Sequence, residues 1–526
     1  MKAFLMYPSA DFDVARTPPW NASALTQDLG LEPVLQAMAR GDAFLLAVAE
    51  AAVLASTADP DTIRYRQAIL RDCLEHRDIV LEIYDIAVAA LERERKEYFG
   101  ILSNYPGSIL SRSTKVMGIL CEQLTALRKL VDRHGDKFES EGFRRWCAML
   151  REELDAGFFE EVGEHLERLR LRHGVFISAK LGKGLKGANY VLRRQQEGRW
   201  RWLRRLLARG EERAYTVYIH PRDEAGGRYL GELRDRGINL VANALAQSVD
   251  HVLDFFRLLR AELAFYIGCA NLHDELGRRG QPTCFPVPLP LGERRFSSRG
   301  LYDVSLALSS ERQVVGNDVN ADDKLLVIIT GANQGGKTTF LRSVGLAHLM
   351  MQCGMFVPAK SLCANACDGL FTHYKREEDT TMKSGKFDEE LKRMSEIVDH
   401  LTPHALLLFN ESFAATNERE GSEIARQIVR ALAGKNKKMF FVTHLYEFAH
   451  RAYRSGVKNA LFLRADRNVD GTRTFKLREA EPLQTSFGDD LYRRIFEAKR
   501  DNEGNPDPDG ELGESVPAGA GCSPTS

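Results

Sequence analysis

The chain has 526 residues, of which 44% are hydrophobic and 28% are charged, and its 73 basic side chains balance 73 acidic ones. A chain of this length exceeds one compact core and predicts about two to four domains. The zero net charge excludes a uniformly basic nucleic-acid-binding protein, so any surface for nucleic acid must come from an uneven distribution of charge.

The cysteines and the apolar runs indicate the compartment. Nine cysteines, an odd number without a paired C-x-x-C, are typical of reduced thiols. Cys363 and Cys367 lie close in sequence, but no second pair of ligands accompanies them, which disfavours a zinc site. No apolar run approaches the roughly 18 residues of a membrane-spanning helix, and Met1–Pro8 is too short for a signal peptide. We therefore expect a cytoplasmic protein with no membrane partner.

The first half of the chain is dominated by helical patterning. Residues 1–27 are expected to form an irregular lead-in, and residues 28–279 a mostly α-helical region. Within it, apolar residues from Arg228 to about Arg278 recur at steps of three and four, which predicts one long helix. Unbroken, this helix would be roughly 70 Å long at about 1.5 Å per residue, although Gly237 could split it. Few globular cores need such a rod, which suggests an arm or lever.

A basic insertion interrupts the helical region at about residues 168–226. Between Arg168 and Arg213 there are 14 lysines and arginines against three acidic residues, a local net charge of +11. Trp200 and Trp202 alternate with arginines there. Such a charge run can be the solvated face of a helix, but aromatic side chains among the cations favour a surface that contacts the phosphates of DNA. The candidates for DNA contact are Lys183, Lys186, Arg193, Arg194, Arg199, Arg201, Arg204 and Arg205.

The second half of the chain has a different composition. From about Gly280 to Asn320 it is rich in proline, glycine and short β-like runs, which marks a domain boundary. Strands and helices then alternate, as in a nucleotide-binding domain with a parallel sheet, and we assign residues 280–498 to this α/β domain. The tail at 499–526 has almost no apolar side chains and predicts disorder. The candidate strands are 325–330, 370–374, 405–409, 439–443 and 459–463.

A glycine-rich loop between a predicted strand and a predicted helix is the strongest functional signal. Residues 331–338 match the phosphate-binding pattern G-x-x-x-x-G-K-[ST], in which backbone N–H groups surround phosphate oxygens. The lysine then contacts the β- and γ-phosphates, and the hydroxyl of Thr338 reaches Mg²⁺. A plain glycine turn is the alternative. The predicted contacts to ATP are Gly331, Ala332, Asn333, Gln334, Gly335, Gly336, Lys337, Thr338 and Thr339.

Two further candidates follow the next apolar strands. Ala405–Phe409 leads to Asn410 and Glu411, where a nucleotide-hydrolysing site needs a metal-shell group and a group that positions water. Glu411 is the candidate for activating water. Asn410 is the candidate that reaches Mg²⁺ through water, although it carries no charge. The strand at 439–443 leads to His444, which places an imidazole near the γ-phosphate; a lone histidine is often structural, but its place at a strand end favours a catalytic role.

In these motifs the chain resembles the MutS family, the DNA mismatch-repair ATPases of the ABC class. Residues 331–342 are similar to the family's G-P-N-M-G-G-K-S-T-x-x-R, and residues 406–416 to its L-x-L-x-D-E-x-G-R-G-T. The specific resemblance covers about residues 310–490, and a looser one reaches back to about residue 28. The shorter matches are Val315–Asp318 to V-P-N-D, Gly354–Ala359 to G-x-x-V-P-A, Thr443–His444 to T-H and Ser486–Gly488 to S-Y-G.

The resemblance implies an α/β P-loop ATPase domain of the ABC type, preceded by a mostly α-helical lever and clamp region. It adds Asn317 to the residues that contact ATP. In ABC ATPases each site is completed by the signature loop of a partner, which here implies a homodimer and assigns Ser384, Phe387 and Glu390 to that loop. ATP binding would then close the dimer on DNA held near the basic insertion.

Departures from the family pattern bear on the activity. Asn410 stands in place of the Walker-B aspartate, Phe413–Ala415 in place of G-R-G, and Val314 in place of an aromatic that can stack on adenine. The family's N-terminal mismatch-reading and connector domains find no room in this chain. The resemblance thus implies a truncated, ATP-dependent DNA-binding protein of mismatch repair, or of a related repair or recombination step, with slow ATP hydrolysis.

Two alternatives use the same nucleotide site. One is an ATP-gated scaffold that hardly hydrolyses ATP and binds a protein partner through its levers, which the uncharged Asn410 favours. The other is a structure-specific binder of DNA junctions or single-stranded regions, which the tryptophans of the basic insertion favour.

Overall fold

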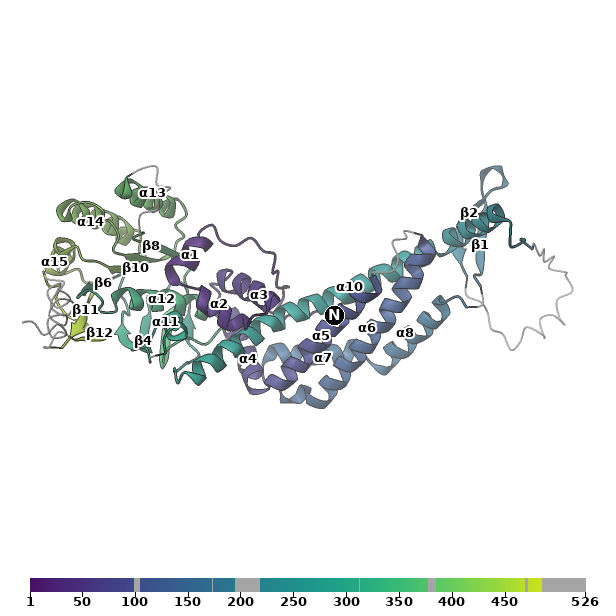
Figure 1. The fold of residues 1–526 in the computed structure, drawn as a ribbon, viewed down its shortest axis with the longest axis horizontal. Helices are drawn as coiled ribbons and strands as arrows, with labels where there is room; N and C mark the ends of the chain where they lie inside the picture. The colour runs from purple at the N-terminus through teal and green to yellow at the C-terminus, as the bar shows by residue number, and fades with distance from the viewer. Residues whose placement is uncertain are drawn as a thin grey trace, which may run out of the picture.

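The computed structural model describes residues 1–98, 105–172, 174–193, 218–311, 313–376, 385–468 and 472–484. The molecule is elongated, with an α/β domain at one end, a helical rod in the middle and a small two-stranded tip at the far end (Figure 1). Within these ranges, no helix is both long and apolar enough to cross a membrane. The predicted tail at 499–526 lies outside the described residues.

The chain begins with a buried extended segment and three short helices. Residues 1–20 form neither helix nor strand, yet Leu5, Met6 and Phe12 are buried in the main core. Asp42 caps the third helix by accepting hydrogen bonds from the next backbone N–H groups. The helices are α1 (Ala22–Leu29), α2 (Glu32–Ala39) and α3 (Ala43–Leu54), the last of which is almost entirely apolar.

Long helices form the rod. The longest, α10 (Glu224–Arg278), has 55 residues and is therefore about 80 Å long at about 1.5 Å per residue. It confirms the predicted helix, and Gly237 does not split it. Instead Gly237 allows a close approach, because a Cβ there would lie 2.4 Å from Ile177 Cδ1. The other helices are α4 (Pro60–Glu75), α5 (Arg77–Tyr98), α6 (Pro106–His134), α7 (Glu141–Glu153) and α8 (Ala156–Leu169).

Within the basic insertion, residues 177–192 form a hairpin rather than a helix. Strands β1 (Ile177–Leu181) and β2 (Gly187–Leu192) pair in antiparallel fashion, and a short 3-10 turn, η2 (Lys183–Leu185), joins them. A small separate core of Leu110, Ile238 and Ala242 anchors the hairpin to α6 and α10. The tip is therefore held at the end of the rod that is remote from the α/β domain (Figure 1).

A six-stranded sheet forms the centre of the α/β domain, in the order β12-β11-β6-β10-β9-β8. All neighbours are parallel except β12, which pairs antiparallel to β11 at the edge. The five predicted strands are confirmed, and each begins within one residue of its expected position. They are β6 (Leu326–Gly331), β8 (Leu370–Tyr374), β9 (Leu406–Asn410), β10 (Lys438–Val442) and β11 (Ala460–Arg467); β12 (Arg473–Glu479) was not predicted.

Helices and a second sheet surround this centre. The helices are α11 (Val304–Ser309), α12 (Lys337–Gln352), α13 (Lys386–Asp399), α14 (Glu418–Gly434) and α15 (Tyr446–Arg454). The second sheet has the order β3-β7-β4-β5 and lies beside α12. Its strands are β3 (Val287–Leu289), β4 (Phe296–Leu301), β5 (Asn317–Asn320) and β7 (Ser361–Asn365).

The α/β domain and the rod meet at a buried arginine. Arg66 of α4 donates from Nε to the Met6 carbonyl at 2.7 Å and lies over the ring of Tyr7, 4.3 Å from its centroid. Gly354, in the turn after α12, lies against the same side chain with a left-handed φ of 80°. A Cβ there would lie 2.3 Å from Arg66 Cβ, so only glycine allows this approach.

Substituting Gly354→Ala should therefore loosen the junction. We expect it to lower the free energy of unfolding by about 1–3 kcal/mol more than Gly41→Ala does, because both glycines have left-handed φ but only Gly354 has a neighbour in the way. Urea unfolding followed by circular dichroism measures the difference. Equal losses in the two variants would mean that the contact with Arg66 carries no cost.

Candidate functional site

The glycine loop joins the end of β6 to the start of α12, as the sequence predicts. Gly331 and Gly336 have φ of 111° and 88°, in the left-handed region that favours glycine. A Cβ at Gly331 would lie 2.8 Å from the Ala465 nitrogen, and one at Gly335 would lie 2.8 Å from the Ala332 carbonyl oxygen. The loop conformation therefore depends on these glycines, and a larger residue would open it.

Lys337 is the first residue of α12, and its ammonium folds back onto the loop. Its Nζ donates to the carbonyls of Gly331 and Ala332, each at 3.0 Å, and the residue is only 5% exposed. Burial lowers the pKa of Lys337 to about 8, against the opposing effect of the Glu411 carboxylate. A bound phosphate would replace weak carbonyl acceptors with charged ones, which would favour the protonated ammonium.

Thr338 and Asn410 bring two oxygen atoms together beside this lysine. The Thr338 hydroxyl donates to Asn410 Oδ1 at 3.0 Å, which joins the first turn of α12 to the end of β9. Hydroxyl and amide oxygens are ligands that suit Mg²⁺, usually together with phosphate oxygens and water. The two residues thus fit a Mg²⁺ ion, which would contribute positive charge beside the phosphates, but they contribute no negative charge to hold it.

Glu411 and His444 face each other across the ends of β9 and β10. His444 Nε2 lies 2.9 Å from Glu411 Oε1, and each side chain is 30% exposed. The hydrogen bond from His444 holds the pKa of Glu411 below its usual value, although burial opposes this. The backbone of Glu411 is left-handed, with a φ of 53°, and its N–H donates to the Val442 carbonyl at 2.9 Å. An ionised, partly accessible carboxylate can orient a water molecule.

Strand β12 borders the glycine loop and was not predicted from the sequence. Arg473 donates from Nε to the Asn333 carbonyl at 3.2 Å. The half-exposed ring of Phe475 lies beside Gly336. Asn317 holds this strand, since its amide donates to the Phe475 carbonyl and its Oδ1 accepts from the Leu477 N–H at 2.7 Å. The alternation of polar and apolar residues at 473–477 is a weak signal that could have indicated β12.

The remaining candidates are either outside the described residues or away from the loop. Ser384, Arg194, Arg199, Arg201, Arg204 and Arg205 lie outside the described residues. Phe387 and Glu390, assigned to the signature loop, lie on α13; Phe387 packs against the core beside β9, and Glu390 is buried. Lys183, Lys186 and Arg193 are exposed on the β1–β2 hairpin. The structure thus brings together the ATP, metal and catalytic candidates on β5, β6, β9, β10 and α12, and places the three described DNA candidates at the distant tip.

Comparisons with known proteins point in the same direction. The model of the MutS2 N-terminal domain matches residues 58–279, and that of MutS domain V matches residues 327–491. The DNA mismatch repair protein MutS of Clostridium kluyveri is 32% identical over 177 residues, which are 32% of this chain and 20% of that protein. The MutS protein of Leptospira interrogans serovar copenhageni is 31% identical over 268 residues, 47% of this chain and 31% of that protein.

These matches place a MutS domain V in the mixed α/β part of the chain. The chain belongs to the MutS family. Its matched part spans between 20% and 31% of the length of these curated relatives. The family models cover residues 58–279 and 327–491 of this chain. Because less than a third of each relative is matched, what the relatives do as whole proteins does not transfer directly to this chain.

The burial of Lys337 predicts a pH dependence of nucleotide binding. The ammonium must be protonated to pair with phosphate, and its pKa in the free protein is about 8. We therefore expect the affinity for ATP to be constant below this pH and to weaken above it by up to about tenfold per pH unit, because binding then requires proton uptake. Titrations with a fluorescent ATP analogue measure the profile. Lys337→Arg is the control, because the charge of an arginine does not titrate in this pH range. The same decline in both proteins would mean that another group causes the pH dependence.

Proposed function

We propose that this chain is an ATP-binding and slowly ATP-hydrolysing protein that acts on DNA in mismatch repair or a related repair or recombination step. The observation that carries the proposal is the meeting of Lys337, the Thr338–Asn410 pair and the Glu411–His444 pair at one edge of the parallel sheet. Nucleotide hydrolysis needs a partner for the phosphates, for a metal ion and for the attacking water, and these are the roles that we assign to Lys337, the Thr338–Asn410 pair and the Glu411–His444 pair, respectively.

The geometry supports the following roles. The loop N–H groups and the Lys337 ammonium bind the phosphates, and the N-terminus of α12 adds its dipole. Thr338 and Asn410 hold Mg²⁺, with Asn410 acting through water. Glu411 orients the attacking water, and His444 keeps that carboxylate ionised and in place. Because Asn410 lacks the charge of an aspartate, we infer a weaker hold on Mg²⁺, by roughly 10–100-fold, and slow hydrolysis.

Glu411→Gln tests the catalytic role. We expect kcat for ATP hydrolysis to fall by about 100-fold or more, because the amide orients water poorly, while the affinity for ATP changes little. Phosphate release and binding of a fluorescent ATP analogue give the two quantities. Glu418→Gln is a matched control, since Glu418 lies nearby but accepts from the Tyr446 N–H at 3.1 Å. Hydrolysis at the parental rate in Glu411→Gln would remove Glu411 from the reaction.

The same variant tests dimer formation. The chain offers one glycine loop and one candidate signature loop, so we propose that two copies complete each other's sites when ATP is bound. Without hydrolysis, Glu411→Gln should remain in the ATP-bound dimer, which light scattering detects. A monomer at saturating ATP would contradict this arrangement and favour the alternative of an ATP-gated scaffold with a protein partner, which the uncharged Asn410 also supports.

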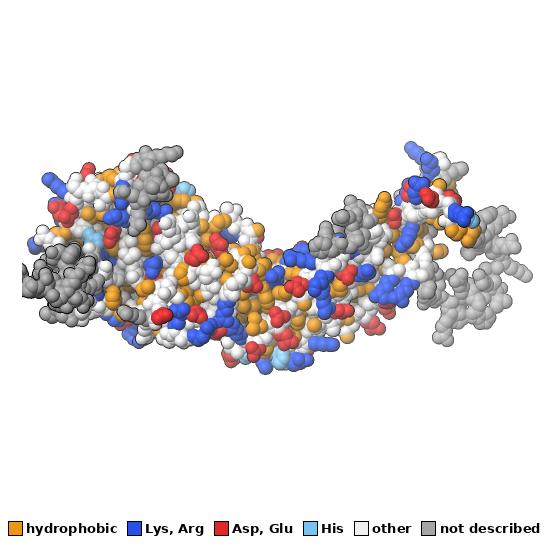
Figure 2. Space-filling model, viewed as in Figure 1, with side chains coloured by type: hydrophobic (Ala, Val, Ile, Leu, Met, Phe, Trp, Pro, Cys, Tyr) orange, Lys and Arg blue, Asp and Glu red, His pale blue; other side chains and the backbone are white. Residues whose placement is uncertain are grey.

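DNA is the proposed partner of the tip. The basic hairpin packs against α10 at Gly237, about 60 Å of helix from the C-terminal end of α10, and Lys and Arg side chains are visible over the tip and the rod (Figure 2). Exposed cations on a protruding element bind the DNA backbone with little sequence preference. A rod of this length can transmit closure of a dimer to the tips.

The tip predicts salt-dependent DNA binding. Replacing Lys183 and Lys186 together with glutamine should make the slope of log affinity against log salt shallower by up to about two units, since each phosphate contact contributes about 0.9. Gel shifts with homoduplex, mismatched and junction DNA at several salt concentrations measure the slope and the preferred structure. Arg454→Gln with Lys458→Gln removes two exposed charges from the α/β domain as a control. An unchanged slope in the hairpin variant would mean that DNA binds to another surface of the protein.

A further inference from the structure

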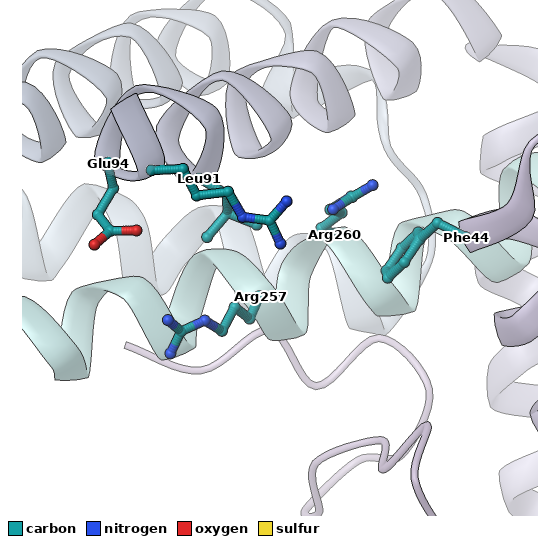
Figure 3. A pocket seen from close by; sticks show the side chains of 6 residues that line it. Phe44, Leu91, Glu94, Arg257 and Arg260 are labelled. Carbon is teal, nitrogen blue, oxygen red and sulfur yellow. The ribbon is translucent and has the colours of Figure 1, made fainter. Parts of the chain in front are cut away.

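A small cavity lies on the helical rod, between α3, α5 and α10 and outside the site at the glycine loop. Its volume is about 190 Å³, and it is lined by Phe44, Leu91, Glu94, Arg95, Arg257 and Arg260. Figure 3 shows Leu91 and Glu94 of α5 opposite Arg257 and Arg260 of α10, with Phe44 at one end. Half of the lining residues are arginines, so the cations of two helices meet at one cavity.

Two carboxylates at the cavity already have partners. Glu94 Oε1 accepts a hydrogen bond from Arg112 Nη2 of α6 at 3.0 Å. Asp254 Oδ1 accepts from Arg257 Nη1 at 2.7 Å, one turn along α10. These pairs satisfy the acidic side chains but leave the cavity with more positive than negative charge. Cations that face each other across a cavity repel, and a bound anion would remove this repulsion.

Arg260 and Arg95 carry the unbalanced charge. The Arg260 guanidinium lies over the ring of Phe44, 3.8 Å from its centroid, which fixes the plane of the group. Its Nε is buried and has no hydrogen-bond partner within the described residues. Within the described residues, the ion pairs at this cavity involve Arg112 and Arg257, not Arg95 or Arg260, while Arg260 is in hydrogen-bond contact with Tyr84. A planar guanidinium held in one orientation is suited to bind the oxygens of a phosphate in pairs.

We propose that this cavity is a binding site for a phosphate-type anion, held by Arg95, Arg257 and Arg260. The volume is below the roughly 300–1,000 Å³ of pockets for larger ligands, which favours a phosphate or pyrophosphate group over a whole nucleotide. Free pyrophosphate and a phosphate of the DNA backbone offer the same chemistry. Because α3, α5 and α10 all line the cavity, a bound anion joins the rod to the short helices beside the α/β domain.

Calorimetry with inorganic pyrophosphate tests the site. The protein carries Lys337→Ala, so that the glycine loop does not add a second phosphate site. We expect one saturable site, and we expect Arg95→Gln with Arg257→Gln to weaken it by at least about tenfold, because two charge-assisted contacts are lost. Both side chains are exposed, so the fold should persist, which circular dichroism checks. Arg93→Gln with Lys96→Gln removes the same charge from α5 outside the cavity and should leave binding unchanged.

Binding of duplex DNA distinguishes the two sources of phosphate. If the cavity variant, but not its control, also weakens DNA binding, the anion is a phosphate of the backbone. If DNA binding is unchanged and only pyrophosphate binding is lost, the ligand is a free small anion. Two results would overturn the proposal: unchanged DNA binding together with no saturable pyrophosphate binding, or equal losses in the cavity variant and its control.

Discussion

The parallel register of β6, β10 and β9 is the constraint on which the candidate site depends. Val442 of β10 pairs with Ile329 of β6 on one side and with Asn410 of β9 on the other, so the last residues of β9 and β10 lie level with Ile329, two residues before the glycine loop begins. Backbone hydrogen bonds continue the alignment, since Glu411 N–H donates to Val442 and Thr443 N–H to Ile329. Residues far apart in the sequence therefore meet within hydrogen-bond distance, with buried apolar strands behind them.

Buried polar groups connect this sheet to the rod. Glu262 of α10 accepts hydrogen bonds from the backbone N–H groups of Leu5 at 2.6 Å and Phe12 at 3.4 Å. Burial raises the pKa of Glu262 to about 7, so its charge is costly to keep in the interior and depends on these donors. Tyr266, one turn further along α10, donates to the Leu5 carbonyl at 2.6 Å. The N-terminal segment thus ties α10 to Arg66 and, through it, to the turn after α12.

The candidate site has groups suited to bind phosphate and to position water, but its metal-binding pair lacks a negative charge. Lys337 is buried with its ammonium on its own loop, so binding phosphate requires only that the partners of Nζ change. The Glu411–His444 pair has the geometry to position water, whereas Asn410 supplies an oxygen without a charge. These three features support the proposal that the protein binds nucleotide and hydrolyses it slowly.

Local sequence by itself determined the five central strands, the glycine loop and the long helix. Buried strands and helices require apolar residues at regular spacing, and the loop requires glycines at fixed positions, so these elements can be recognised from neighbouring residues alone. It did not reveal β12 or β5, which are short and partly polar and gain their hydrogen bonds from distant partners, as Asn317 does from Phe475 and Leu477. Nor did it indicate that Gly237 serves close packing against Ile177 or that Arg95 and Arg260 share a cavity. Only the tertiary structure decided these points, because each depends on contacts between elements that no local pattern records.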